Sequence, residues 1–147
     1  MYKNNDHKLA VVLNSKIALP RLFNAAVHCV AGLVARLEPT ALQFEPYFNA
    51  DEKWEASISR FPNIILKARN GSQLSKLRAD ASAAGVPINH FVSTMVGMSA
   101  EQQLELTRVA KSVDLEFWAV AVFGDAEEVG ALTRKFSLFN VGGDDVA

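Results

Sequence analysis

The chain has 147 residues, of which 50% are hydrophobic and 21% charged, and its formal net charge at pH 7 is −1. This balance excludes disordered and collagen-like chains and is typical of one soluble globular domain. A net charge near zero also disfavours a dedicated nucleic-acid-binding protein, although a local basic patch stays open. We expect residues 8–140 to form the ordered core and residues 1–7 and 141–147 to fray.

Cysteine usage and hydropathy bear on the compartment. The single cysteine, Cys29, cannot form an internal disulfide, and we interpret it as a small buried hydrophobic residue. The polar opening at residues 1–8 lacks the pattern of a signal peptide, and no apolar run approaches the roughly 20 residues of a membrane span. We therefore expect a cytoplasmic protein with no membrane association.

The first strand and helix give the strongest structural signal. Residues 9–13 are a continuous apolar run, which is typical of a strand buried on both faces. After a polar turn at 14–16, residues 22–37 form a helix that is apolar almost all the way round and so belongs in the interior. One polar stripe interrupts it at helical spacing: Arg21, Asn24 and His28. Such groups need a partner, a solvent-filled cleft or a ligand.

Residues 41–60 are the least regular part of the chain. They mix aromatic and charged residues, so the segment is too aromatic for a disordered linker and long for a loop. One interpretation is an excursion whose aromatic side chains pin it to the core. The other is a flap over a pocket, lined in part by Tyr47 or Trp54.

The remaining chain alternates strands and helices. Strands are expected at 61–68, 88–93 and 115–123, with a short edge strand at 136–139. Helices are expected to begin at the capping signals Asn70, Ser99 and Asp125. This order predicts a three-layer α/β sandwich whose first crossover is parallel and right-handed.

The predicted strand ends indicate where a site would lie, because ligands of open α/β sheets bind beyond the carboxyl ends of parallel strands. The first strand ends at Asn14 and Lys16, and the second at Lys67. The third ends at Ser93 and Thr94, at the same edge if it runs parallel. Cations on this rim could hold a phosphate or carboxylate, although surface solvation explains each one equally well. The cations are Lys16, Arg21, Lys67 and Arg69.

His28 has two interpretations. It is either a neutral, hydrogen-bonded histidine of the interior or a general base, since imidazole exchanges protons near neutral pH. His7 and His90 lack the spacing of a metal pair with His28, and no glycine-rich phosphate loop occurs, so we expect neither a metal nor a cofactor. Ser93 and Thr94 lack the glycine-flanked elbow of a catalytic serine, so no triad is predicted.

Three stretches carry a resemblance to a known family: LAVVLNSKIALPRLFNAAVHCVAGL, PNIILKARNGSQLSKLRADASAAGVPINHFV and AVAVFGDAEEVGALTRKFSLF. They resemble the type II peptidyl-tRNA hydrolases, and more specifically an uncharacterised bacterial branch that shares their fold. The resemblance covers most of the chain outside residues 40–60 and 95–114. It implies a three-layer α/β/α sandwich with a mixed four-stranded sheet and a site beside the first helix.

The resemblance carries over residue by residue only in part. Arg21 takes the place of one lysine of the family, and His28 falls on the family's helix histidine. Other positions of the family pattern hold different residue types here. The second lysine, the acidic residue, the threonine and the strand glycine are replaced by Leu19, Ser93, Phe117 and Val120.

We derive two candidate functions from these residues. The first is a small hydrolase acting on an ester or amide with an anionic substituent, with His28, Asn24 and Ser93 as its catalytic group. Its substrate-binding residues would be Asn14, Lys16, Arg21, Lys67 and Thr94. The alternative is a non-catalytic module that binds a small anionic molecule or a partner protein. Weak tRNA binding and a homodimer also stay open.

Overall fold

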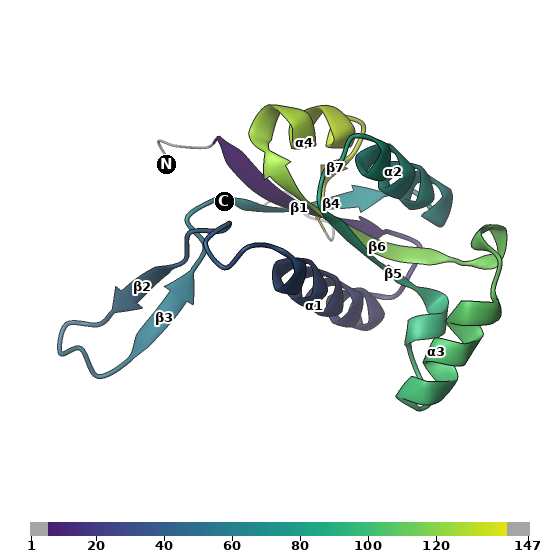
Figure 1. Cartoon of the computed structure of the whole chain (residues 1–147), viewed down its shortest axis with the longest axis horizontal. Coiled ribbons are helices and arrows are strands. Elements are labelled where there is room, and N and C mark those ends of the chain that lie inside the picture. Colours follow the sequence, from purple (N-terminus) through teal and green to yellow (C-terminus); the bar gives the residue numbers. More distant parts are fainter. Residues whose placement is uncertain (1–5, 141–147) are drawn as a thin grey trace.

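The computed structural model describes residues 6–140 (Figure 1). Its strands are β1 (His7–Asn14), β2 (Glu45–Phe48), β3 (Glu55–Ile58), β4 (Asn63–Ala68), β5 (Ile88–Val92), β6 (Phe117–Asp125) and β7 (Ser137–Leu138). Its α-helices are α1 (Leu19–Arg36), α2 (Gly71–Ala83), α3 (Ala100–Val109) and α4 (Ala126–Thr133). Two short 3-10 turns are η1 (Ser93–Met95) and η2 (Ser112–Asp114). Of the expected frayed ends, residues 1–5 and 141–147 lie outside the described residues, whereas His7 already belongs to β1.

The main sheet is mixed and five-stranded, in the order β5-β6-β1-β4-β7. Strands β1 and β4 are parallel, and β6 is antiparallel to both β1 and β5. Strand β5 therefore runs in the same direction as β1 and β4, so the three predicted strand ends do share one edge. The count exceeds the implied four because the short segment β7 pairs antiparallel with β4.

Helices cover both faces of this sheet, with α1 on one face and α2 and α4 on the other (Figure 1). Alternate residues of β1 point to opposite faces: Leu9, Val11 and Leu13 pack on the α1 side, and Ala10 and Val12 on the other. All five are buried. A strand covered on both faces needs no polar alternation, which explains its continuous apolar run.

Helix α1 differs from the prediction, because it lies on the surface of the sheet rather than inside the protein. Its buried face consists of Leu22, Ala25, Cys29 and Leu33. Its outer face exposes Phe23 to 61% and Val27 to 70%, and the polar stripe is exposed as well. The prediction of an interior helix is therefore wrong, since a largely apolar sequence does not say whether anything covers the second face of the helix.

A reciprocal pair of contacts fixes α1 to the edge strand β5. The Cys29 thiol donates a hydrogen bond to the Asn89 carbonyl oxygen (3.2 Å), and the Asn89 side-chain amide donates to the Cys29 carbonyl oxygen (3.0 Å). At Gly32 a Cβ atom would come within 2.4 Å of the Asn89 amide nitrogen, so the glycine permits this close approach. Cys29 is fully buried, which confirms its interpretation as a small core residue.

Residues 45–58 form a separate hairpin, which we call the arm. Its strands β2 and β3 pair with each other and belong to no other sheet. Figure 1 shows the arm projecting away from the body of the protein. Tyr47 and Trp54 are 54% and 62% exposed, and neither lines a described hollow. The interpretation of aromatic side chains pinned to the core is therefore wrong, and the arm is not a flap over any of these four hollows.

Helix α3 also stands apart from the sheet and packs against η1 (Figure 1). The predicted capping box is present, with Ser99 accepting from the Gln102 backbone and the Gln102 side chain accepting from the Ser99 backbone. Its apolar residues Leu104 and Val109 are nevertheless 71% and 59% exposed. Within residues 6–140, no helix combines the length and hydrophobicity needed to cross a bilayer.

Candidate functional site

Asn14 is the first predicted site residue that the structure reassigns. Its side chain is buried, donating a hydrogen bond from Nδ2 to the Phe117 carbonyl oxygen (3.0 Å) and accepting one from the Lys16 backbone (3.0 Å). These bonds join the end of β1 to the start of β6 and shape the turn into α1. Asn14 therefore holds the scaffold together rather than facing a ligand, while the side chain of Lys16 is exposed.

A hollow of about 890 Å³, which we call the cleft, opens at the carboxyl ends of β1 and β4. Three cationic side chains line it: Lys67 at the end of β4, Arg69 just after it, and Lys135 after α4. Polar groups from four other places join them: Ser15, Gln73, Ser137 and Asn140. Of the described residues that line the cleft, none is acidic.

Local hydrogen bonds hold the floor of the cleft in place. Lys67 Nζ donates to Asn140 Oδ1 (3.3 Å), and the Arg69 backbone donates to Gln73 Oε1 (2.8 Å). Helix α2 begins beside it at the predicted cap, where the Asn70 side chain accepts from the Gln73 backbone (3.0 Å). The cleft thus occupies the position at which open α/β sheets bind ligands.

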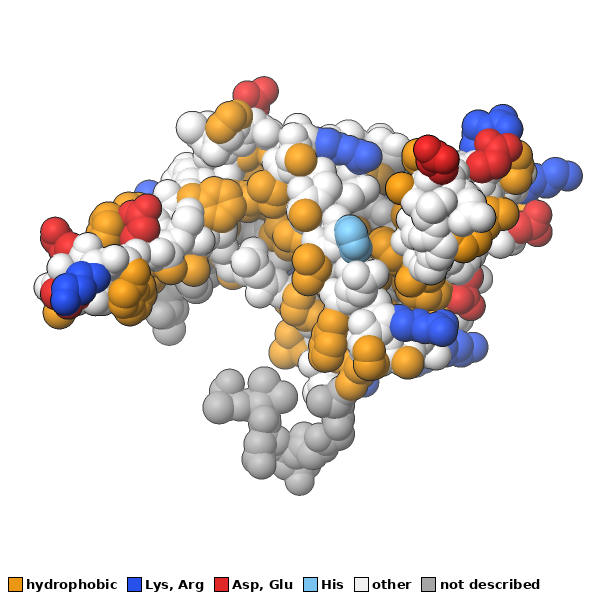
Figure 2. Space-filling model, turned by 90° about the horizontal axis from the view of Figure 1, so that it is seen from below, with side chains coloured by type: hydrophobic (Ala, Val, Ile, Leu, Met, Phe, Trp, Pro, Cys, Tyr) orange, Lys and Arg blue, Asp and Glu red, His pale blue; other side chains and the backbone are white. Residues whose placement is uncertain are grey.

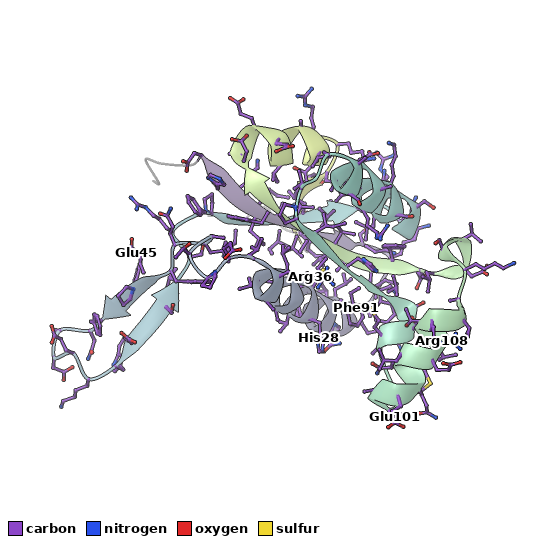
Figure 3. The ribbon with its side chains drawn as sticks, viewed as in Figure 1. His28, Arg36, Glu45, Phe91, Glu101 and Arg108 are labelled. Atoms are coloured by element: carbon purple, nitrogen blue, oxygen red, sulfur yellow. The ribbon has the colours of Figure 1, made fainter. Side chains whose placement is uncertain are left out.

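A second hollow of about 880 Å³, which we call the groove, lies between α1 and the η1–α3 segment. Asn24 and His28 form its α1 wall, Phe91 its floor, and Met95, Met98 and Gln103 its opposite wall. Figure 3 shows His28 on α1 and Phe91 close to it, on the side of α1 nearer α3. The His28 and Phe91 rings stack at 5.9 Å between centroids with an interplanar angle of 25°. His28 is therefore exposed, and the interpretation as an interior histidine is wrong.

Aromatic contacts continue from the groove toward the start of α1. The centroids of the Phe91 and Trp118 rings lie 5.7 Å apart. The Arg21 guanidinium lies over the Trp118 ring, 5.7 Å from its centroid. Trp118 Nε1 donates to the Glu116 carboxylate (2.9 Å). Arg21 is therefore held by an aromatic face instead of pointing into the cleft.

Contrary to the prediction, Ser93 and Thr94 at the end of the third strand line neither hollow. The Ser93 backbone donates to the Glu116 carbonyl oxygen (2.9 Å), and Ser93 lines neither the cleft nor the groove. Thr94 Oγ1 lies 2.6 Å from Thr107 Oγ1, whose single hydroxyl proton is donated to the Gln103 carbonyl oxygen (2.8 Å). Thr94 is therefore the donor in this pair, and its bond fastens η1 to α3.

His90 borders the groove, but its ring packs on Phe117 in the core beneath α2, 5.4 Å away. Burial, and then the positive charges of Arg78 and Arg36, lower the pKa of His90 below its usual value. Burial raises the pKa of the Cys29 thiol to about 12, so this cysteine is an inert packing group. Among residues 6–140, no cluster of three or more His, Cys, Asp or Glu side chains is placed to hold a metal ion.

The predicted rim is therefore divided. Lys67 and Arg69 lie together in the cleft, whereas Asn24 and His28 lie together in the groove. Lys135 and Asn140 were missed as cleft residues. The only sequence signal for them was the expected edge strand at 136–139, whose pairing with β4 brings its flanking residues to the carboxyl end of that strand.

These features define a mixed α/β protein with two open hollows beside its first helix. Residues 7–140 match DUF2000, a family described as a protein of unknown function, and the chain belongs to this family. No curated protein matches the chain. It is similar to the solved structure of a protein of unknown function from Agrobacterium tumefaciens str. C58, with a TM-score of 0.76 and 19% identity over 92% of this chain and 98% of that one. At this identity the likeness establishes the fold.

Proposed function

We propose that this protein is a binding module for a small molecule that carries a phosphate or carboxylate, held in the cleft. The observation that supports the proposal is the set of cationic side chains, Lys67, Arg69 and Lys135, converging on one hollow in which none of the lining residues among 6–140 is acidic. All three positive charges would attract an anion in this hollow.

The division of roles among the cations follows from their chemistry. A guanidinium such as Arg69 can donate two parallel hydrogen bonds to one phosphate or carboxylate, whereas an ammonium such as Lys67 acts as a compact charge. Ser15 and Gln73 add neutral hydrogen-bonding groups beside them. The apolar side chains of Ile17, Leu19 and Phe139 line the same cleft, so the ligand would have an organic part beside its anionic group.

Calorimetric titration with inorganic phosphate and with a phosphomonoester tests this proposal. We expect binding to both, with the ester tighter, and at least a tenfold loss of affinity in the double variant Lys67→Gln, Arg69→Gln. Lys76→Gln is the matched control, because Lys76 lies on the exposed face of α2 in an ion pair with Asp80 (2.8 Å). No heat of binding up to about 10 mM, or equal loss in the control, contradicts the proposal.

Hydrolysis in the groove is the second candidate, and the exposed imidazole of His28 beside Asn24 favours it. An imidazole can accept a proton from water as the water attacks an ester or amide, while an adjacent amide orients the substrate. None of the contacts of residues 6–140 joins His28 to Ser93, so an activated water fits this arrangement better than a serine nucleophile.

Turnover of activated esters and of peptidyl-tRNA by the purified protein tests the second candidate. If His28 is the base, His28→Ala lowers kcat by 100-fold or more and Asn24→Ala chiefly raises KM. His7→Gln serves as the control, because His7 lies at the start of β1, at the end of the strand away from the turn into α1. Unchanged turnover in His28→Ala rules out the reaction without affecting the proposal for the cleft.

A further inference from the structure

The arm carries an apolar surface that the rest of the chain leaves uncovered. Its exposed aromatic and aliphatic residues are Tyr47, Phe48, Trp54 and Ile58, at 54%, 56%, 62% and 43%. Cross-strand pairing puts Tyr47 and Ile58 on one face of the hairpin and Phe48 on the other. Apolar groups thus occur on both faces. Because a two-stranded hairpin alone is marginal in water, this arm needs a covering surface for stability.

The outer face of α1 carries a second uncovered apolar surface. Phe23 and Val27 are one helical turn apart and are exposed to 61% and 70%. In the view of Figure 2, hydrophobic side chains run along the middle of the molecule, and a hollow separates them from the arm at the left. The arm and α1 therefore bound one concave face of the protein.

Charges on these two surfaces have opposite sign. The arm carries Glu45, Asp51, Glu52 and Glu55 against the single cation Lys53, which pairs with Asp51 (3.4 Å). Helix α1 has no acidic residue along Leu19–Arg36 and carries two exposed arginines. The Arg21 guanidinium lies over the Trp118 ring, and Arg36 Nη1 donates to the Ile88 carbonyl oxygen (3.2 Å), so both keep their positive charge without an acidic partner among the described ion pairs. Figure 3 shows Glu45 on the arm and Arg36 on α1, on separate parts of the molecule.

We propose that two copies of this chain associate about a twofold axis, with the arm of each copy packed across the outer face of α1 of the other. Both halves of the contact, an acidic apolar arm and a basic apolar helix, are present on every chain, so a second copy satisfies both at once. The aromatic side chains of the arm cover Phe23 and Val27, and its carboxylates approach the arginines of α1. The proposal is independent of the cleft, whose cations lie elsewhere.

Sedimentation equilibrium first tests the association. We expect a mass twice the 16.0 kDa of the chain at about 10 µM protein. Phe23→Ser on α1 weakens the dimer at least tenfold, and so does at least one of Tyr47→Ser and Phe48→Ser on the arm. Leu138→Ser is the matched control, since Leu138 on β7 is as exposed as Phe23, at 61%. We expect this control variant to stay dimeric. A monomer at about 100 µM, or a dimer that none of the three substitutions weakens, overturns the proposal.

A charge exchange then tests which surfaces meet. The double variant Glu45→Lys, Glu55→Lys reverses the charge of the arm, and Arg21→Glu, Arg36→Glu reverses the charge of α1. A homodimer of either double variant would place like charges at both contacts. Mixed in equal amounts, the two variants regain opposite charges at both contacts, and we expect a heterodimer at least tenfold tighter than either homodimer. Circular dichroism confirms that each variant is folded. If both variants are folded and the mixture stays as weak as its components, the arm does not lie on α1.

Discussion

The cleft and the groove both border α1, yet they are built from different kinds of residue and on different supports. The cations of the cleft extend from β4, its following turn and the end of α4, and they are held by elements of the main sheet and its covering layer. The groove combines an imidazole, an aromatic floor and two methionines, and one of its walls belongs to α3, which packs on η1 rather than on the sheet. Fixed charges suit anion binding, whereas an adaptable wall suits an organic ligand of variable shape.

The largest expected effect concerns Asn14, which joins the end of β1 to the start of β6 between the two hollows. Replacing Asn14 by Ala removes the donor to the Phe117 carbonyl oxygen and leaves that buried oxygen without its partner. We expect a loss of about 2–4 kcal/mol in the free energy of unfolding, measured by urea denaturation. The neighbouring exposed residue Ser15, changed to Ala, should cost less than about 0.5 kcal/mol. Equal effects of the two substitutions would contradict the structural role of Asn14.

Ionic strength separates the cleft from the groove. Phosphate binding by Lys67, Arg69 and Lys135 should weaken by roughly tenfold between about 20 mM and 300 mM salt, because counterions screen a cationic site. His28→Ala should leave the phosphate affinity within about twofold of the wild-type value, since His28 lines the other hollow. A large loss of phosphate affinity in this variant would mean that the two hollows act as one site.

Thr94 tests whether the α3 wall is held independently of the sheet. Changing Thr94 to Val removes the hydrogen bond to Thr107, worth about 1 kcal/mol, between η1 and α3. Hydrogen exchange of α3 amides should accelerate several-fold, while the amides of α2 serve as the internal control and keep their rates. Phosphate affinity should not change. Acceleration spread evenly over the whole chain would show that α3 unfolds only with the rest.

The smallest expected effect concerns pH. The pKa of His90 is lowered in the folded protein from its ordinary value of about 6.5. As the pH falls below that ordinary pKa, the unfolded chain therefore binds a proton at His90 more readily than the folded protein does. This contribution to stability is complete above that value and is lost as the pH falls toward the folded pKa. The melting temperature should therefore fall between about pH 7.5 and about pH 5.5, and the fall should be smaller in His90→Phe. An equal fall in both proteins would assign it to other groups.

Local patterns were enough to predict most elements of the fold. The apolar run of β1, the caps Asn70, Ser99 and Asp125, and the short edge strand all lie where the sequence placed them. The direction of β5 was left open as a condition, and pairing through β6 shows that β5 runs in the same direction as β1. The arm was missed, because aromatic composition does not distinguish side chains that face a core from side chains that face water.

The candidate site was predicted only in part, for a reason of topology. Strand β6 runs between β1 and β5, so the carboxyl ends of β1 and β5 are separated by the start of an opposing strand. Asn14 and Ser93 are both bonded to that intervening segment, through Phe117 and Glu116. The first pairing joins residues 103 positions apart, and the second joins two different predicted elements, so residue spacing along the chain reveals neither of them.

The close fit of Gly32 against Asn89 has a mechanical consequence for the groove. The α1 wall is fastened to β5 at this point by two hydrogen bonds, and a Cβ atom at Gly32 would displace the Asn89 side-chain amide that makes one of them. The facing wall is connected to β5 through residues 93–99, where Gly97 and Met98 take positive φ angles of 71° and 53°, and to β6 through residues 110–116. The α1 wall is thus fixed to the sheet, whereas the α3 wall is attached through irregular segments. We therefore expect a bulky ligand to enter the groove by a movement of α3 rather than of α1.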